Sequence, residues 1–144
     1  MDAIFWSSYG GVSEAQAYEL EENGVSFYRL EGDVSTENNG GFIQVRTEVS
    51  LRIKDFKGIR IKVRGNNNEY YVHLRSPRML PWNYYSSKFY ATEEWQVIDL
   101  PVSSFEYSRD VSKSFNSSKI KSIGIVAFGK DFFAQVDIAG TEIY

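Results

Sequence analysis

Apolar and polar residues alternate with a period of two from about residue 14 to the end of the chain, and no long helical period interrupts them. Turn-forming residues divide this pattern into about nine short segments, which is typical of an all-β sandwich or barrel. We therefore predict an antiparallel two-sheet β-sandwich without a long helix. The segments expected to be strands are 15–21, 25–32, 41–48, 59–65, 69–76, 84–92, 95–100, 119–130 and 132–144.

Turn residues predict how some of these segments are joined. Asn23-Gly24 fits a type I′ hairpin turn, because both central positions of that turn need positive φ, and the resulting register places Leu20 opposite Phe27. We expect segment 84–92 to form a further hairpin with 95–100, and segment 119–130 to pair with 132–144. Single helical turns are expected at 55–57 and at 102–105.

Length and composition narrow the class of protein. The 144 residues are the usual size of one domain, and we expect 1–144 to form a single β-sandwich domain. The absence of cysteine excludes disulfides, thiolate zinc sites and cysteine nucleophiles, and the net charge of −3 argues against nucleic acid as a partner. No segment approaches the roughly 20 apolar residues that span a bilayer, and the first residues lack a basic n-region. We expect no membrane insertion and no signal peptide in this chain.

The alternation also assigns side chains to faces. In three central segments the outward positions carry cationic, aromatic and amide side chains: Gln44, Arg46, Arg60, Lys62, Arg64, Tyr71, His73 and Arg75. Treating the three segments as neighbours, we expect these side chains on one solvent-facing surface. One interpretation is an ordinary wet sheet face whose cations pair with nearby carboxylates. The other is a concave surface that binds a polyol, carboxylate or phosphate through arginine contacts and ring stacking.

An aromatic loop lies beside this predicted face. Trp82, Tyr84 and Tyr85 follow Pro77 and Pro81 in an irregular segment. Exposed aromatic residues on such a loop are suited to bind sugars, whereas buried ones cap a core. Both interpretations remain open from the sequence. Trp95, at the start of a regular segment, is expected in the core.

Catalysis is not indicated. His73 is the only histidine, so it would have to build any triad alone, and Ser76 nearby follows a strand without a nucleophile elbow. Acid–base chemistry needs a positioned partner, and none is visible. We expect no enzyme activity, no cofactor and no metal site.

Several segments, in order along nearly the whole chain, resemble one family. They are Gly10-Gly11-Val12-Ser13, Asn38–Phe42 followed by Val45-Arg46, 57–65 with 70–75, Trp95–Val97 with Leu100-Pro101 and Ser104-Phe105, and 120–128. Together they resemble the domain of complex I intermediate-associated protein 30, an assembly-factor family of the mitochondrial respiratory complex with bacterial relatives. The resemblance implies a galactose-binding-type jelly roll. Together with the lack of a signal peptide, it implies a cytoplasmic, mitochondrial or other organellar location. Departures at 6–9 and 129–133 imply a divergent member.

Two functions are therefore expected as alternatives. The first is a non-catalytic interaction module that recruits a protein partner, as in assembly of a respiratory or other membrane protein complex. The second is a carbohydrate-binding module that uses the wet sheet face and the aromatic loop. A protein-binding surface should show an exposed apolar patch, whereas a sugar site should place flat rings beside Arg and Asn. In either case the predicted ligand-binding residues are Arg46, Arg64, Tyr71, His73, Arg75, Trp82, Tyr84 and Tyr85.

Overall fold

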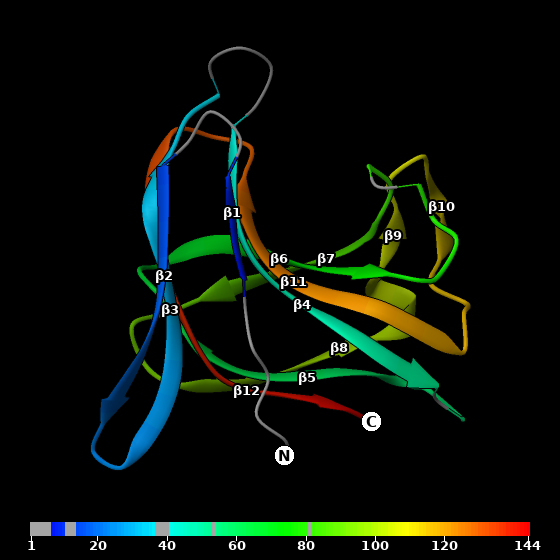
Figure 1. Ribbon diagram of the computed structural model, residues 1–144, viewed down its shortest axis with the longest axis horizontal. Helices are drawn as coiled ribbons and strands as arrows, with labels where there is room; N and C mark the ends of the chain where they lie inside the picture. Colours follow the sequence, from blue (N-terminus) through cyan, green and yellow to red (C-terminus); the bar gives the residue numbers. More distant parts are fainter. Residues whose placement is uncertain (1–6, 11–13, 37–40, 53, 81) are drawn as a thin grey trace.

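Two antiparallel sheets pack face to face in the computed structural model, which describes residues 7–10, 14–36, 41–52, 54–80 and 82–144 (Figure 1). Seven strands form one sheet in the order β1-β4-β11-β6-β7-β9-β10, and five form the other in the order β2-β3-β12-β5-β8. The predicted β-sandwich is confirmed.

The strand bounds are as follows. The seven-stranded sheet contains β1 (Ser7–Gly10), β4 (Phe42–Arg52), β11 (Lys119–Phe128), β6 (Asn68–Arg75), β7 (Tyr85–Ala91), β9 (Glu106–Tyr107) and β10 (Asp110–Ser114). The five-stranded sheet contains β2 (Glu14–Glu22), β3 (Val25–Val34), β12 (Phe132–Ile143), β5 (Gly58–Arg64) and β8 (Gln96–Pro101). A 3-10 turn, η1 (Val102–Ser104), follows β8.

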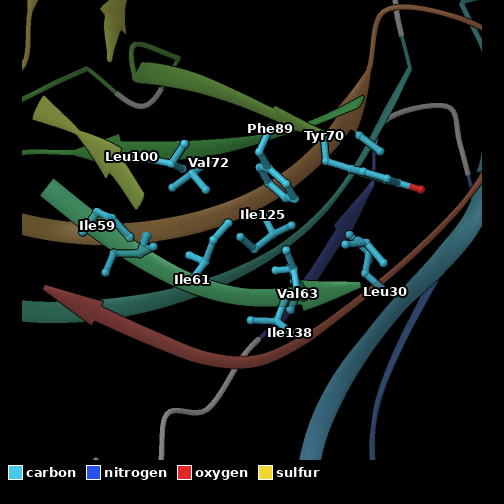
Figure 2. Close-up of a cluster of buried hydrophobic side chains, with 14 of the residues drawn as sticks. Leu30, Ile59, Ile61, Val63, Tyr70, Val72, Phe89, Leu100, Ile125 and Ile138 are labelled. Atoms are coloured by element: carbon cyan, nitrogen blue, oxygen red, sulfur yellow. The ribbon is translucent and has the colours of Figure 1, made fainter. Parts of the chain in front are cut away.

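The core fills the space between the two sheets. Alternate residues of the central strands point into it, and most of these side chains are fully buried (Figure 2). From the five-stranded sheet come Leu30, Ile59, Ile61, Val63 and Ile138, and from the seven-stranded sheet Tyr70, Val72, Phe89 and Ile125. The intervening positions of each strand therefore face away from the core, on one of two opposite outer faces.

The predicted hairpin between β2 and β3 is confirmed. Asn23 and Gly24 have φ of 52° and 79°, as a type I′ turn requires, and Leu20 pairs with Phe27. Among the described residues, η1 is the single helical element. It lies within the turn expected at 102–105. The turn expected at 55–57 is wrong, because Asp55 has a φ of 58° and the chain bends there without a helix.

Two predicted pairings are also wrong. Segments 84–92 and 95–100 become β7 and β8, which lie in different sheets, and 119–130 and 132–144 become β11 and β12, which are likewise separated. In both cases the short connection crosses from one sheet to the other instead of forming a hairpin. Alternation shows which side of a strand is buried but does not show to which sheet the strand belongs. The short strands β1, β9 and β10 were not expected.

The seven-stranded sheet is strongly bent. In Figure 1 β9 and β10 rise at one side and β1 with the start of β4 at the other, while β5, β8 and β12 lie beneath. The face of this sheet that points away from the core, called the outer face below, therefore lies inside the bend. No helix among the described residues is long and apolar enough to cross a membrane.

Candidate ligand-binding site

Three neighbouring strands bring Arg46, Gly124 and His73 side by side on the outer face. Gly124 of β11 pairs with Arg46 of β4 on one side and with His73 of β6 on the other. One step along, Ser122 of β11 lies between a glutamate of β4 and Arg75 of β6 in the same way. Because side chains two residues apart share a face, Arg46, His73, Arg75 and Ser122 converge.

A small pocket opens among these side chains. It has a volume of about 60 Å³, and we call it the outer-face pocket. Its lining residues are Gln44, Arg46, His73, Arg75, Asn83, Tyr84, Ser122 and Gly124. Gly124 provides room, since a Cβ there would lie 3.0 Å from Nε2 of Gln44. A glycine inside a strand often marks such a close approach.

His73 forms one wall of the pocket, and Tyr84 stacks on it. The two rings are nearly parallel, with centroids 4.0 Å apart and planes 8° apart. His73 is 9% exposed, and burial lowers its pKa to about 3. The imidazole is therefore neutral at physiological pH and acts as a flat, polarizable wall instead of a cation.

Arg75 is a buried cation that holds the neighbouring loop. Its Nε donates to the carbonyl of Asn83 at 3.1 Å, and its Nη2 donates to the carbonyls of Met79 and Leu80 at 3.3 and 3.0 Å. No carboxylate among the described residues forms an ion pair with it. Burial, and to a lesser degree the Arg46 guanidinium, lowers the pKa of Arg75.

Arg46 adds a second guanidinium to the pocket. Its Nε lies 3.1 Å from Oε1 of Glu48, which is more than half exposed. Two arginines and one carboxylate therefore surround the pocket, and with a neutral His73 the local charge is positive. This contrasts with the net charge of −3 of the whole chain.

Three polar atoms that line the pocket have no hydrogen-bond partner among the described residues. They are Nε2 of His73, Oδ1 of Asn83 and Oγ of Ser122. All three side chains are at least nine-tenths buried, with 9%, 6% and 1% exposed. Buried polar groups normally have partners, so their concentration at one pocket makes it a candidate site for a polar ligand.

Beside the pocket lies an aromatic platform, formed by Tyr71 and Phe128. Their ring centroids are 4.5 Å apart, and His73 lies 6.5 Å from Tyr71 and 5.9 Å from Phe128. Both rings are half-buried and belong to the outer face. The platform therefore adjoins the pocket wall on β6 and β11.

The structure brings together five of the predicted site residues: Arg46, Tyr71, His73, Arg75 and Tyr84. The first four come from the predicted outward positions of β4 and β6. Tyr84 comes from the aromatic loop, where its N–H donates to Oγ of Ser108 at 3.1 Å. The discriminating arrangement expected of a sugar site, a flat ring beside Arg and Asn, is present.

The placement of Arg64 with these residues is wrong. Arg64 belongs to β5 of the five-stranded sheet, so it lies on the opposite outer face together with Arg60 and Lys62. Its Nε donates to Oδ2 of Asp137 at 2.8 Å and its Nη2 to Oε2 of Glu22 at 3.0 Å. For Arg64 the alternative of structural pairing with carboxylates is the one that the structure supports.

Tyr85 and Trp82 also lie outside the pocket. Tyr85 points inward and packs against the core beside Phe115, with ring centroids 5.1 Å apart. Trp82 is 63% exposed at the tip of the loop, next to Leu80, which is 52% exposed. Only Tyr84 of the three loop aromatics lines the pocket.

The expectation that Trp95 belongs to the core is wrong. It is half-buried and packs on the outer side of the five-stranded sheet, edge-on to Phe27 at 5.4 Å and beneath the Arg64 guanidinium at 4.6 Å. Trp95 is in step with Val97 and Asp99, which face away from the core, whereas Ile98 and Leu100 face the core.

Sequence reasoning missed Asn83, Ser122 and Gly124 as lining residues. Asn83 stands between two aromatic residues in the loop, and no pattern distinguishes it there. Ser122 follows a register shift between Ile120 and Ser122, which disturbs the alternation of β11. The isolated glycine in a strand was a usable signal for Gly124. Two motifs of the resemblance contain paired glycines, at 10–13 and at 38–42. Their residues 11–13 and 38–40 lie outside the described residues.

Comparison with known proteins gives a family and a fold. The family model described as Complex I intermediate-associated protein 30 (CIA30) matches residues 6–136. No curated protein sequence matches the chain.

Solved structures of similar fold include carbohydrate-binding modules. The family 11 module of the cellulosomal cellulase Lic26A-Cel5E of Clostridium thermocellum is 14% identical, with a TM-score of 0.80 over 99% of this chain and 88% of that chain. The family 11 module of C. thermocellum in complex with a β-1,3-1,4-mixed-linked tetrasaccharide is 17% identical, with a TM-score of 0.70 over 94% and 88%. TmCBM61 in complex with β-1,4-galactotriose is 10% identical, with a TM-score of 0.54 over 96% and 87%. At these identities the likeness establishes a shared fold.

Proposed function

This chain belongs to the complex I intermediate-associated protein 30 family, and from that premise we propose that it is a non-catalytic binding module whose bent seven-stranded sheet binds a carbohydrate. The observation that carries the proposal is the outer-face pocket with its adjoining aromatic platform. There a histidine–tyrosine stack, two guanidiniums and three unpartnered polar atoms meet on one face.

Carbohydrates match this surface in two ways. A sugar ring has an apolar face that packs against aromatic side chains. The half-buried rings of Tyr71 and Phe128, tilted 35° to each other, offer an aromatic contact surface for it. Its hydroxyl groups donate and accept hydrogen bonds, which would satisfy Oδ1 of Asn83, Oγ of Ser122 and Nε2 of His73. Small-ligand sites commonly combine an apolar lining with a few convergent polar groups.

Solved structures of similar fold also support the proposal. Two modules of similar fold hold a mixed-linked tetrasaccharide and a galactotriose. Fold alone does not determine function, so the proposal depends on the site residues. No three carboxylate or imidazole side chains among the described residues gather to hold a metal ion, and the proposal invokes none.

A second candidate function is recruitment of a protein during assembly of a respiratory complex. The family's description supports it, and so does the exposed apolar tip formed by Leu80 and Trp82. Exposed tryptophan and leucine side chains suit a protein interface. In this case the partner would contact the loop tip, and the pocket would be secondary.

The carbohydrate proposal is tested by affinity electrophoresis and titration calorimetry against a panel of soluble neutral and acidic polysaccharides. We expect at least one to bind, and Tyr71→Ala to weaken it about tenfold or more, since an aromatic stacking surface is removed. The matched control is Tyr18→Ala, on the other sheet, which should leave affinity unchanged.

Failure of every polysaccharide to bind would reject the carbohydrate proposal. If, in addition, Leu80→Ser with Trp82→Ser reduced the amount of mature complex I in the source cell, recruitment of a protein would be the better function. The two outcomes involve different residues, so they can be separated by experiment.

A further inference from the structure

We infer that the outer-face pocket receives the carboxylate of an acidic sugar, a uronic acid residue whose ring lies on the Tyr71–Phe128 platform. This inference rests on the proposed function and names the class of carbohydrate. The observations behind it are the positive charge, the size and the hydrogen-bonding groups of the pocket.

Charge favours an anion. Arg75 is 9% exposed and forms no ion pair with a described carboxylate; its guanidinium donates instead to the backbone carbonyls of Asn83, Met79 and Leu80. Arg46 brings a second guanidinium and Glu48 a single, more than half-exposed carboxylate. Burying a cation without a charged partner is costly, and an anionic ligand at the pocket would offset that cost.

Size favours a single functional group. A volume of about 60 Å³ is room for a few water molecules, because each needs roughly 10–15 Å³ by this measure. A whole sugar ring does not fit in it. The pocket therefore holds one substituent, and the remainder of the ligand extends over the outer face.

The lining groups match a carboxylate and its neighbouring hydroxyl. A carboxylate accepts hydrogen bonds from guanidinium N–H groups in a planar arrangement, and Oγ of Ser122 can donate one more. Oδ1 of Asn83 can only accept, so it needs a ligand hydroxyl beside the carboxylate. A uronic acid carries both groups on one ring.

His73 contributes a neutral ring between the pocket and the platform. Because burial lowers its pKa to about 3, the ring is neutral, and the positive charge comes from the arginines at any physiological pH. The ring spans the distance between the pocket and the platform, with centroids 6.5 Å from Tyr71 and 5.9 Å from Phe128. A ligand on the platform thus reaches the pocket across His73.

The test uses the full chain and matched pairs of polysaccharides in titration calorimetry. Polygalacturonate is compared with its methyl-esterified form, and polyglucuronate and alginate with their carboxyl-reduced forms. We expect at least one acidic polymer to bind about ten- to a hundredfold more tightly than its neutral counterpart, as loss of charged hydrogen bonds predicts. Dextran sulfate serves as a polyanion without carboxylates and should bind weakly.

Variants assign the effect to the pocket. Arg46→Gln should weaken binding of the acidic polymer about tenfold and leave the neutral form unchanged. Arg75→Gln should act in the same direction, but Arg75 also holds the loop, so Arg46 and Ser122→Ala are the decisive changes. Arg60→Gln, on the opposite sheet, is the matched control and should have no effect.

Three results would overturn the inference. Equal binding of acidic and neutral forms would retain a carbohydrate site but reject the carboxylate. Equal binding of dextran sulfate, or equal losses in Arg60→Gln and Arg46→Gln, would indicate non-specific attraction of a polyanion. Binding of no polysaccharide at all would reject the proposed function together with the inference.

Discussion

The rings of His73 and Tyr84 lie parallel, 4.0 Å apart between centroids and 8° apart in plane. This stack fixes the end of the loop before β7 against the outer face of β6. Tyr84 is held from the other side, because its carbonyl accepts a hydrogen bond from the N–H of Ser108 at 2.8 Å. The stack therefore joins a core strand, the loop and the β9–β10 turn into one wall of the pocket.

Substitution of Gly124 should close the pocket while leaving the sandwich intact. In Gly124→Val the added side chain would enter the space beside Gln44, whose flexible end can move aside. Valine is favoured in strands, so we expect the melting temperature to change by only a few degrees. Carbohydrate affinity should fall about tenfold or more, because the valine side chain takes up pocket space that a ligand group would occupy.

Calorimetry with Gly124→Ala provides a graded control, since a single methyl group fills less of the pocket and should weaken binding less. Full affinity in Gly124→Val would show that the ligand binds elsewhere.

Burial of His73 should make folding stability depend on pH between about 6.5 and 3. The unfolded chain binds a proton on this imidazole near its ordinary pKa of 6.5, whereas the folded chain does so only near a pKa of about 3. Below pH 6.5 the unfolded state therefore binds more protons, and stability falls as the pH falls. From pH 7 to pH 5 we expect a loss of about 2 kcal/mol, at 1.4 kcal/mol per unit.

Urea unfolding of His73→Phe isolates this contribution, because phenylalanine preserves the ring opposite Tyr84 and does not titrate. Its stability should change little between pH 7 and pH 5. An equal loss in wild type and His73→Phe would show that His73 takes up its proton normally in the folded chain.

Asp137 should be a stability determinant on the opposite face. Its carboxylate is 3% exposed, and it accepts from Nε of Arg29 at 2.8 Å and from Nε of Arg64 at 2.8 Å. Asp137→Ala leaves two guanidiniums without their shared partner, which costs about 3–5 kcal/mol when such a pair is buried. Denaturant unfolding should show this loss without any change in carbohydrate affinity measured under folding conditions.

The matched control is the exposed pair of Arg60 and Asp99, whose Nε and Oδ1 are 2.7 Å apart. Surface ion pairs contribute little. Asp99→Ala should therefore leave stability almost unchanged, and a loss as large as that of Asp137→Ala would contradict the role assigned to burial.

Trp95 and Trp82 should differ in their contribution to stability. Trp95 packs against Phe27 and Arg64, whereas Trp82 is 63% exposed. We expect Trp95→Ala to lower the free energy of unfolding by up to about 3 kcal/mol and Trp82→Ala by less than about 0.5 kcal/mol. Thermal unfolding compares them directly, and equal melting temperatures would contradict the observed difference in burial.

Much of the fold follows from local sequence patterns. Asn23-Gly24 specifies its turn because of the backbone conformation it favours, and the register of Leu20 with Phe27 follows from that turn. The inward positions of the central strands follow from a period of two. These are properties of single strands or of neighbouring residues, so one sequence is sufficient to predict them.

Sheet membership was less predictable. The turn after Arg64 carries the chain from the five-stranded to the seven-stranded sheet, although Arg64 and Tyr71 have the same outward alternation. Alternation distinguishes core from solvent but does not distinguish two solvent faces. Arg46, His73 and Arg75 were therefore grouped correctly, while Arg64 was placed with them wrongly.

Lining residues that depend on tertiary contacts were the least predictable. Asn83 enters the pocket because Arg75 binds its carbonyl, at 3.1 Å, and Tyr84 stacks on His73. Both contacts join a loop to a strand, and neither has a local sequence signature. Ser122 is in step with Gly124 on the outer face, but the register shift after Ile120 means that counting from the buried Ile120 would place Ser122 in the core.

The most direct test of carbohydrate binding at the outer-face pocket is a nuclear magnetic resonance titration with an oligosaccharide of the best-binding polymer. His73 is the only histidine, so its ring signals are unique in the spectrum, and Gly124 supplies an amide at the pocket. We predict saturable shifts of both signals, with the residues around Asp137 on the opposite sheet unaffected. Shifts confined to the five-stranded sheet, or no shift of His73 and Gly124 at saturating ligand, would contradict the account.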